Sequence, residues 1–339
     1  MGGNAIYPPT GIENVGPTPG TTTMQPGTFY IDKLSRVLSY APRRPDLHAP
    51  RSRSPPTSRA AAGEEEESPP AEMADVVLPL AEQLVVGAGT KAAPIAGVRF
   101  EAIRFESTTW GRPAGLLGYV EIQSGKIIDG YGWPGASCPG LQPVPGAVAF
   151  HNATGIAVDR CEFARLGTAG VTMSTRAQRC VVGRSYFHDL SGGAVDLGVY
   201  SWTDPGTGAF LDAPVSQDPR DWDRDNVVAN NTVVGVGVEF RGSAGIAAGY
   251  TAGTAIVANE VDTVPNTAIS VGWGWGRGAN RTALETMMRD NRVAGNKCHG
   301  YKRVLNDGGC VCECDRPPCH PAAPRCAPLR PVAPRAGFP

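Results

Sequence analysis

Acidic residues that could act as paired catalytic groups recur through the second half of the chain. Cleavage of a glycosidic bond needs two carboxyl groups, about 5–5.5 Å apart for retention and about 6.5–9.5 Å apart for inversion of the anomeric configuration. Neighbouring parallel strands lie about 4.8 Å apart, so carboxyl groups on adjacent or next-adjacent strands meet either requirement. The candidates for this chemistry are Asp307, Asp262, Glu239, Asp196 and Asp189.

Asp307 ranks first among these candidates, both for its backbone setting and because it lies in Val304–Gly309, a motif that a resemblance given below makes significant. It precedes Gly308 and Gly309, and a tight backbone without side chains lets the neighbouring carboxylate approach a ligand closely. The alternative is a turn aspartate that accepts a hydrogen bond from its own backbone.

The other candidates differ in how they fit the repeating pattern of the chain. Counted by repeat, Asp262 falls one unit before Asp307, which makes it an open second choice. Asp189 takes the place of Asp262 in an earlier unit, and this equivalence favours a structural turn residue. Asp196 alternates with apolar neighbours and should point outward from its strand. Glu239 is a further possible partner.

Aromatic residues could supply a binding surface near these carboxylates. Trp273 and Trp275 alternate with glycines, so both rings should project to one side of an extended segment and could stack on a sugar ring. An aromatic cover packed on the protein is the alternative. Tyr250 could add a polar contact, whereas a lone histidine at a turn, such as His188, is more often structural.

The elements that must position these residues are short strands. A block of about 20–28 residues recurs between Val98 and Val311, and each copy holds three short runs of alternating apolar and polar residues separated by Gly, Asn, Asp or Ser. Because no run is long enough for a helix, the pattern predicts an all-β, right-handed parallel β-helix with three strands per coil. The clearest copies are 155–173, 180–197, 227–250 and 255–271.

Two long, glycine-rich or tryptophan-rich segments, 109–142 and 201–224, interrupt the repeats and should leave the coils as loops that build a binding site. Other segments lack enough apolar residues to fold. The predicted organisation is a disordered N-terminal segment at 1–26, a β-hairpin of the solenoid domain at 27–41, a disordered insertion at 42–72, the β-helix at 73–316 and a disordered proline-rich tail at 317–339.

Composition narrows the class of protein. The 339 residues include 43 Gly, 19% are charged and the net charge is −1, which is unlike the basic stripe of a nucleic-acid binder. No apolar run approaches the roughly 20 residues that span a bilayer, and no signal peptide is visible. Cys161 and Cys180 should be small core residues. The run Cys310–Cys314 does not have the spacing of a zinc site, so we expect no metal and no cofactor.

A set of short segments follows one another in a characteristic order: Pro26–Asp32, Glu82–Val86, Phe105–Trp110, Gly118–Gln123, Pro145–Val148, Gly242–Ile246, Ile269–Gly276 and Val304–Gly309. In this order they resemble the right-handed parallel β-helix proteins near family 141 of the glycoside hydrolases, in the pectate-lyase-like superfamily. The resemblance implies a secreted or lumenal carbohydrate-active enzyme. The chain departs from the pattern through the 42–72 insertion and through the cysteine- and proline-rich stretch after Gly309, where the family would continue with further coils.

Three hypotheses about function follow. The first is a monomeric glycoside hydrolase-like protein that acts on or binds a plant or microbial polysaccharide, with Asp307, Asp262, Glu239 and Asp196 as catalytic candidates. The second is a carbohydrate-binding solenoid, or an inactive remnant, without catalysis. The third is a polysaccharide lyase, which needs a basic residue beside an acidic calcium cluster. The acidic run at 221–225 has no evident basic partner among the strands, so the lyase ranks lowest.

Overall fold

The described residues fall into two units, one before Pro79 and one from Pro79 onward. In the first unit, β1 (Phe29–Asp32) pairs antiparallel with β2 (Val37–Tyr40), the two strands expected of the hairpin. Within the predicted 42–72 insertion and its border, β3 (Leu47–His48) pairs antiparallel with β4 (Glu72–Met73). The computed structural model describes residues 29–32, 37–40, 47–48, 72–73, 77, 79–111, 119–122, 125–129, 141–198, 202–203, 210–211, 218–272 and 288–313.

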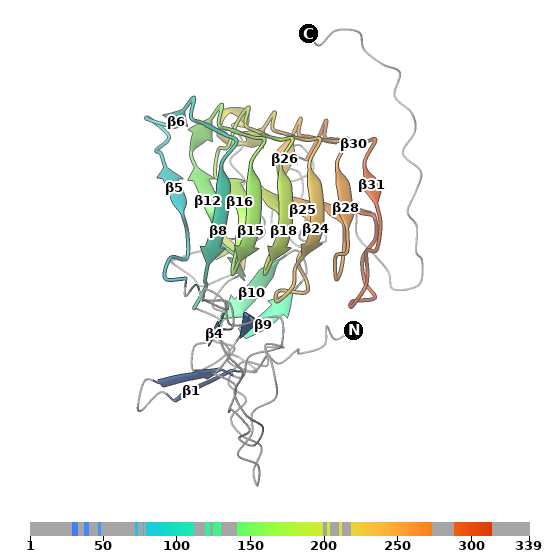
Figure 1. Ribbon diagram of the computed structural model, residues 1–339. Coiled ribbons are helices and arrows are strands. Elements are labelled where there is room, and N and C mark those ends of the chain that lie inside the picture. Colours follow the sequence, from blue (N-terminus) through green and yellow to red (C-terminus); the bar gives the residue numbers. More distant parts are fainter. Residues whose placement is uncertain are drawn as a thin grey trace, which may run out of the picture. The chain divides into compact units, whose positions relative to one another are not determined.

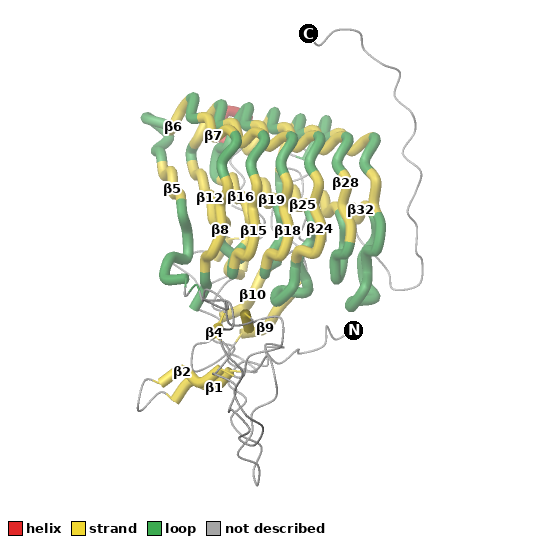
Figure 2. Tube along the Cα trace, in the orientation of Figure 1, coloured by secondary structure: helices red, strands yellow, loops and turns green. Residues whose placement is uncertain are grey.

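The second unit is a right-handed parallel β-helix, as the repeats predict (Figure 1). Each coil contributes one strand to each of three long parallel sheets, and in Figure 2 the strands stack as successive yellow segments joined by green turns. No α-helix occurs in the described residues. The domain boundaries predicted from the sequence stay predictions.

The strands of the three sheets follow one another along the solenoid axis. The first sheet contains β5 (Val85–Ala88), β12 (Gly146–His151), β16 (Ala169–Ser174), β19 (Val195–Leu197), β25 (Ile246–Ala248), β29 (Ile269–Val271) and β32 (Val311–Glu313); the second contains β7 (Arg99–Glu101), β14 (Ala157–Asp159), β17 (Val181–Gly183), β23 (Val227–Ala229), β27 (Ala255–Val257) and β30 (Arg292–Ala294); the third contains β8 (Arg104–Thr108), β15 (Glu162–Leu166), β18 (Tyr186–Leu190), β24 (Thr232–Val236), β28 (Glu260–Asp262) and β31 (Lys297–Cys298).

Some coils carry a further short strand at the corner between the first and second sheets, which the three-strand pattern did not predict. These strands form two parallel pairs. They are β6 (Ile95–Ala96) with β13 (Ala153–Thr154), and β22 (Asp223–Arg224) with β26 (Thr251–Ala252).

Stacked apolar side chains fill the interior. On the third sheet, Phe105, Phe163 and Phe187 occupy one register, and their ring centroids lie 4.9 and 4.6 Å apart in stacked geometry. Cys161 and Cys180 are 2% and 1% exposed, so the prediction that they are small core residues is confirmed. Burial of such a continuous apolar column is the main stabilising contribution in a solenoid.

The turn from the second to the third sheet is held by a ladder of polar side chains. The backbone N–H of Cys161 donates to Ser185 Oγ, and the N–H of Ser185 donates to Asn231 Oδ1, each at 3.0 Å. In the same way, the N–H of Asn231 donates to Asn259 Oδ1 at 3.0 Å, and the N–H of Asn259 donates to Asn296 Oδ1 at 2.9 Å. These bonds satisfy buried backbone donors that the sheets leave unpaired, which explains the asparagines between repeats.

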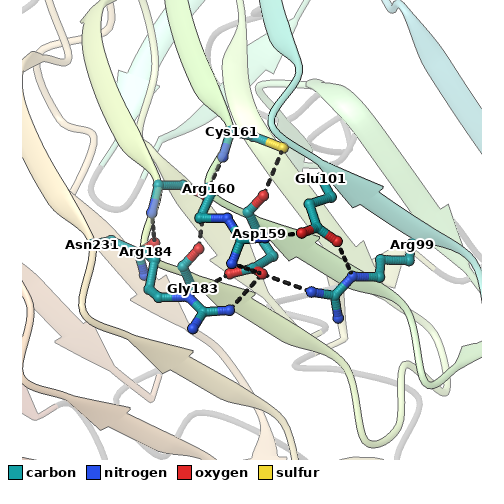
Figure 3. A network of polar contacts seen from close by, with 9 residues as sticks. Arg99, Glu101, Asp159, Arg160, Cys161, Gly183, Arg184 and Asn231 are labelled. Carbon is teal, nitrogen blue, oxygen red and sulfur yellow. Dashed lines mark hydrogen bonds and ion pairs between the residues drawn. The ribbon is translucent and has the colours of Figure 1, made fainter.

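Ion pairs cross the outer face of the second sheet (Figure 3). Asp159 accepts hydrogen bonds from Arg184 at 2.8 and 2.6 Å and from Arg99 at 2.7 Å, and Arg160 pairs with Glu101. The Arg184 guanidinium is the largest cause of a pKa of Asp159 below its usual range. Because the charged side chains on this face pair with one another, we assign the face to stabilisation of the fold and look for the functional site elsewhere.

The long segments leave the coils at the two ends of the first-sheet strands. Between β8 and β12 lies an antiparallel sheet of β9 (Tyr119–Ile122), β10 (Lys126–Asp129) and β11 (Leu141–Pro143). Between β19 and β22 lie a second pair of strands and a 3-10 helix. These are β20 (Trp202–Thr203), β21 (Phe210–Leu211) and η3 (Pro219–Asp221).

Candidate functional site

The outer face of the first sheet carries a row of small and polar residues at one register. The row contains Ala149, Thr172, Asp196, Ala247 and Ser270 on successive strands. Asp196 lies between two buried core residues of β19 and faces outward, as its alternation predicts. The small side chains on either side of this carboxylate leave room for a ligand above it.

A cavity opens beside Asp196, where residues of the excursion between β8 and β12 and of the segment between β24 and β25 meet the first sheet. Its volume is about 240 Å³ when the opening to solvent is included. The enclosed part is much smaller: the centre of a water-sized group can move within about 10 Å³. That is the room that one water molecule or hydroxyl group needs. The lining includes Asp196, Ser243, Gly125, Val144, Val195 and Ala247.

Ser243 is the second polar side chain of this lining. The residue is 2% exposed, and its Oγ has no hydrogen-bond partner among the residues that the structure describes. A Cβ atom at Gly125 would lie 3.0 Å from this Oγ, and Gly125 also has a left-handed φ of +65°. Both constraints favour glycine at this turn of the β9–β10 hairpin.

Glu121 on β9 holds the segment that carries Ser243. Its carboxylate accepts hydrogen bonds from the backbone N–H groups of Gly242 and Arg241. In the same segment, Phe240 packs against Trp110 with 5.3 Å between ring centroids. The segment between β24 and β25 is thus fixed at two points by the excursion between β8 and β12.

Burial raises the pKa of Glu121 to about 7, because desolvation of the carboxylate outweighs the two backbone hydrogen bonds and the charge of Arg241. The folded protein therefore binds this proton more tightly than the unfolded chain does. The stabilising contribution is complete below the unfolded value of 4.5 and is lost as the pH rises through about 7.

Glu121→Gln should remove this pH dependence. Because one pKa unit corresponds to about 1.4 kcal/mol, the free energy of unfolding of the variant minus that of the wild type should increase by about 3 kcal/mol between pH 4.5 and pH 8. Urea unfolding of both proteins across this range measures the difference. A difference that stays constant with pH would contradict the assigned shift.

The other acidic candidates lie away from the Asp196 cavity lining. Asp307 is exposed in the segment between β31 and β32, and Glu239 is exposed beside the buried Phe240. Asp262 is at the end of β28 on the third sheet, where its Oδ1 accepts a hydrogen bond from the N–H of Thr263 at 2.6 Å.

The repeat equivalences assumed for Asp189 and Asp262 are shifted by one residue. Asp262 is in register with Val234 and, one coil earlier, with His188. Asp189 instead matches the left-handed position taken by Thr263, with φ of 54° and 55°. Aspartate tolerates this conformation better than most residues, so the structural role favoured for Asp189 is supported.

Tyr250 is 1% exposed, one of the largest fully buried side chains, and we leave it out of the proposed site. Trp273 and Trp275 lie outside the described residues. His188 hydrogen-bonds with Glu162 at 3.0 Å and stacks on Tyr186, which is a structural arrangement on the third sheet.

Sequence reasoning missed Glu121 and Ser243. A signal for Glu121 was present, because it is an acidic residue within the otherwise apolar or aromatic run Tyr119–Ile122. Ser243 lies in Gly242–Ile246, one of the segments that carry the resemblance, but a serine between glycine and alanine has no pattern that marks its side chain as part of a site.

The acidic run of the lyase hypothesis makes structural contacts. Asp223 accepts a hydrogen bond from the N–H of Ala177 at 2.6 Å, and Asp225 pairs with Arg224 at 2.6 Å. Among the described residues, no three His, Cys, Asp or Glu side chains gather closely enough to hold a metal ion. Cys310 of the cysteine run forms a disulfide with Cys298. No described helix has the length and apolarity needed to cross a membrane.

Comparison with solved structures agrees with the observed fold. The chain is similar to a solved structure described as a glycoside hydrolase, with a TM-score of 0.64 and 29% sequence identity. The match covers 83% of this chain and 44% of the other, so the chain spans less than half the length of that protein. No family model and no curated protein matches the chain.

Proposed function

We propose that the protein binds a polysaccharide or oligosaccharide on the outer face of the first sheet and hydrolyses a glycosidic bond there, with Asp196 as one of the two carboxyl groups. The observation that carries this proposal is the position of Asp196, which lines a cavity on the face that the long segments border. The likeness to a glycoside hydrolase supports the reaction class.

Hydrolysis needs a second carboxyl group beside the scissile bond. Asp307, Asp262 and Glu239 remain candidates for it, and Trp273 or Trp275 is proposed to stack on a sugar ring of the substrate. We expect the protein to act as a monomer on a glycan of plant or microbial origin.

Binding without cleavage is the second candidate function. Among the described residues, the lining of the cavity contains one carboxylate, Asp196. A single carboxylate with a neighbouring hydroxyl can bind sugar hydroxyl groups, because the former accepts and the latter donates or accepts hydrogen bonds. This arrangement suffices for recognition even where a second catalytic group is missing.

A panel of 4-nitrophenyl glycosides, covering both anomers of the common hexoses, 6-deoxyhexoses and pentoses, tests the proposal. Release of nitrophenol by the wild type is the expected result, and loss of that release in Asp196→Asn assigns it to this site. Binding of glycans on an array without release from any glycoside would favour the second function. If the wild type neither releases nitrophenol nor binds any glycan, both candidate functions are overturned.

A further inference from the structure

We infer that the cavity beside Asp196 admits one hydroxyl group of a neutral sugar, which Asp196 and Ser243 bind together, so that Ser243 determines specificity. This inference rests on the proposed function and adds the part of the substrate that the site selects.

The first observation is the unpartnered hydroxyl of Ser243, which is 2% exposed. Leaving a buried hydroxyl without a hydrogen bond costs about 1–3 kcal/mol, so native proteins rarely retain one without a reason. Ser243 and Asp196 both line the same cavity. A ligand hydroxyl in this cavity would give Ser243 the partner that the protein itself does not.

The second observation is the size and rigidity of the cavity. It has room for about one hydroxyl-sized group, and close backbone packing fixes its walls. A Cβ atom at Gly193, one of the lining residues, would lie 2.5 Å from the carbonyl oxygen of Ala244. Glu121 holds the neighbouring Gly242. Walls held in this way select by shape, since they cannot move aside for a larger substituent.

The third observation is the chemistry of the lining. A sugar hydroxyl can donate to the Asp196 carboxylate while it exchanges a second hydrogen bond with Ser243 Oγ. The remaining side chains of the lining are apolar, among them Val144, Val195 and Ala247. A carboxylate substituent would be repelled by Asp196 in this poorly solvated place, so the site favours a neutral sugar over a uronic acid.

The test compares Ser243→Ala with the control Thr254→Val. Thr254 also has a buried, unpartnered hydroxyl, is 2% exposed and precedes β27 of the second sheet. Each variant removes one such hydroxyl with little change in shape. Both should keep the wild-type midpoint of urea unfolding or exceed it, because the lost hydroxyl makes no hydrogen bond in the folded protein.

The readout is hydrolysis of the fastest 4-nitrophenyl glycoside of the panel and of its monodeoxy analogues. In the wild type and in Thr254→Val, removal of one particular hydroxyl should lower kcat/KM by roughly 10- to 100-fold. In Ser243→Ala, the intact substrate should already be poorer by a similar factor, and the same deoxygenation should cost less than about 3-fold. This loss of the deoxygenation effect is specific to a shared hydrogen bond.

Two other results separate the inference from the function on which it rests. Equal deoxygenation effects in the wild type and in Ser243→Ala, with an active wild type, would overturn the inference and leave the proposed function standing. A wild type that neither hydrolyses nor binds any member of the panel would overturn the proposed function, and the inference with it.

Discussion

Asp196→Asn should lower kcat for glycoside hydrolysis by at least about 100-fold while the protein stays folded. The amide keeps the shape of the side chain but cannot ionise, and a positioned acid or base contributes typically 10²- to 10⁴-fold to the rate. Asp196 lies on the outer face of β19, between the core residues Val195 and Leu197, so the substitution leaves the interior unchanged. Steady-state kinetics and circular dichroism of the variant measure both parts of the prediction.

Asp189→Asn is the matched control for this variant. Asp189 is exposed on the third sheet at a left-handed position, which asparagine also tolerates, so turnover should remain that of the wild type. Wild-type turnover in Asp196→Asn would contradict the assignment. A large loss in Asp307→Asn would then identify Asp307, the first choice from sequence, as the essential carboxylate.

Phe163→Ala should lower the free energy of unfolding by about 3–5 kcal/mol. The ring of Phe163 is fully buried and lies between those of Phe105 and Phe187, with centroid separations of 4.9 and 4.6 Å. Its removal leaves a cavity in a column where each coil rests on the next, so both neighbouring coils lose contacts. Urea unfolding followed by circular dichroism measures the change.

Val181→Ala is the control for the core variant, because Val181 is on the outer face of the second sheet and is 40% exposed. It should cost about 0.5 kcal/mol or less. If Phe163→Ala were no more destabilising than Val181→Ala, the stacked phenylalanine column would not be a main source of stability.

The fold was predictable from the sequence because its determinants are local and repeated. The coils place apolar residues inward at fixed spacing, as at Phe163 and Phe187, and several place a polar residue at the turn, as at Asn231 and Asn259. Alternation within a single strand was also enough to orient Asp196. Such signals are present in the residues themselves and need no knowledge of distant contacts.

The cavity was not predictable, because segments that do not repeat create it. Glu121 meets Gly242, 121 positions later in the chain, and no periodicity records that contact. The equivalence of Asp189 and Asp262 failed for a related reason. Each third-sheet strand has a left-handed residue near its end, and a shift of one residue there exchanges an outward side chain for a turn position.

The most direct test of the central claim, a glycan site beside Asp196 and Ser243, is amide hydrogen exchange with and without bound sugar. The probe is an excess of the monosaccharide released from the fastest aryl glycoside. The structure predicts slower exchange in residues 193–197 and 241–245, with little change in the second-sheet strand β23 (Val227–Ala229). Protection of residues 299–310 instead, with unchanged exchange beside Asp196, would contradict the claim and place the site at Asp307.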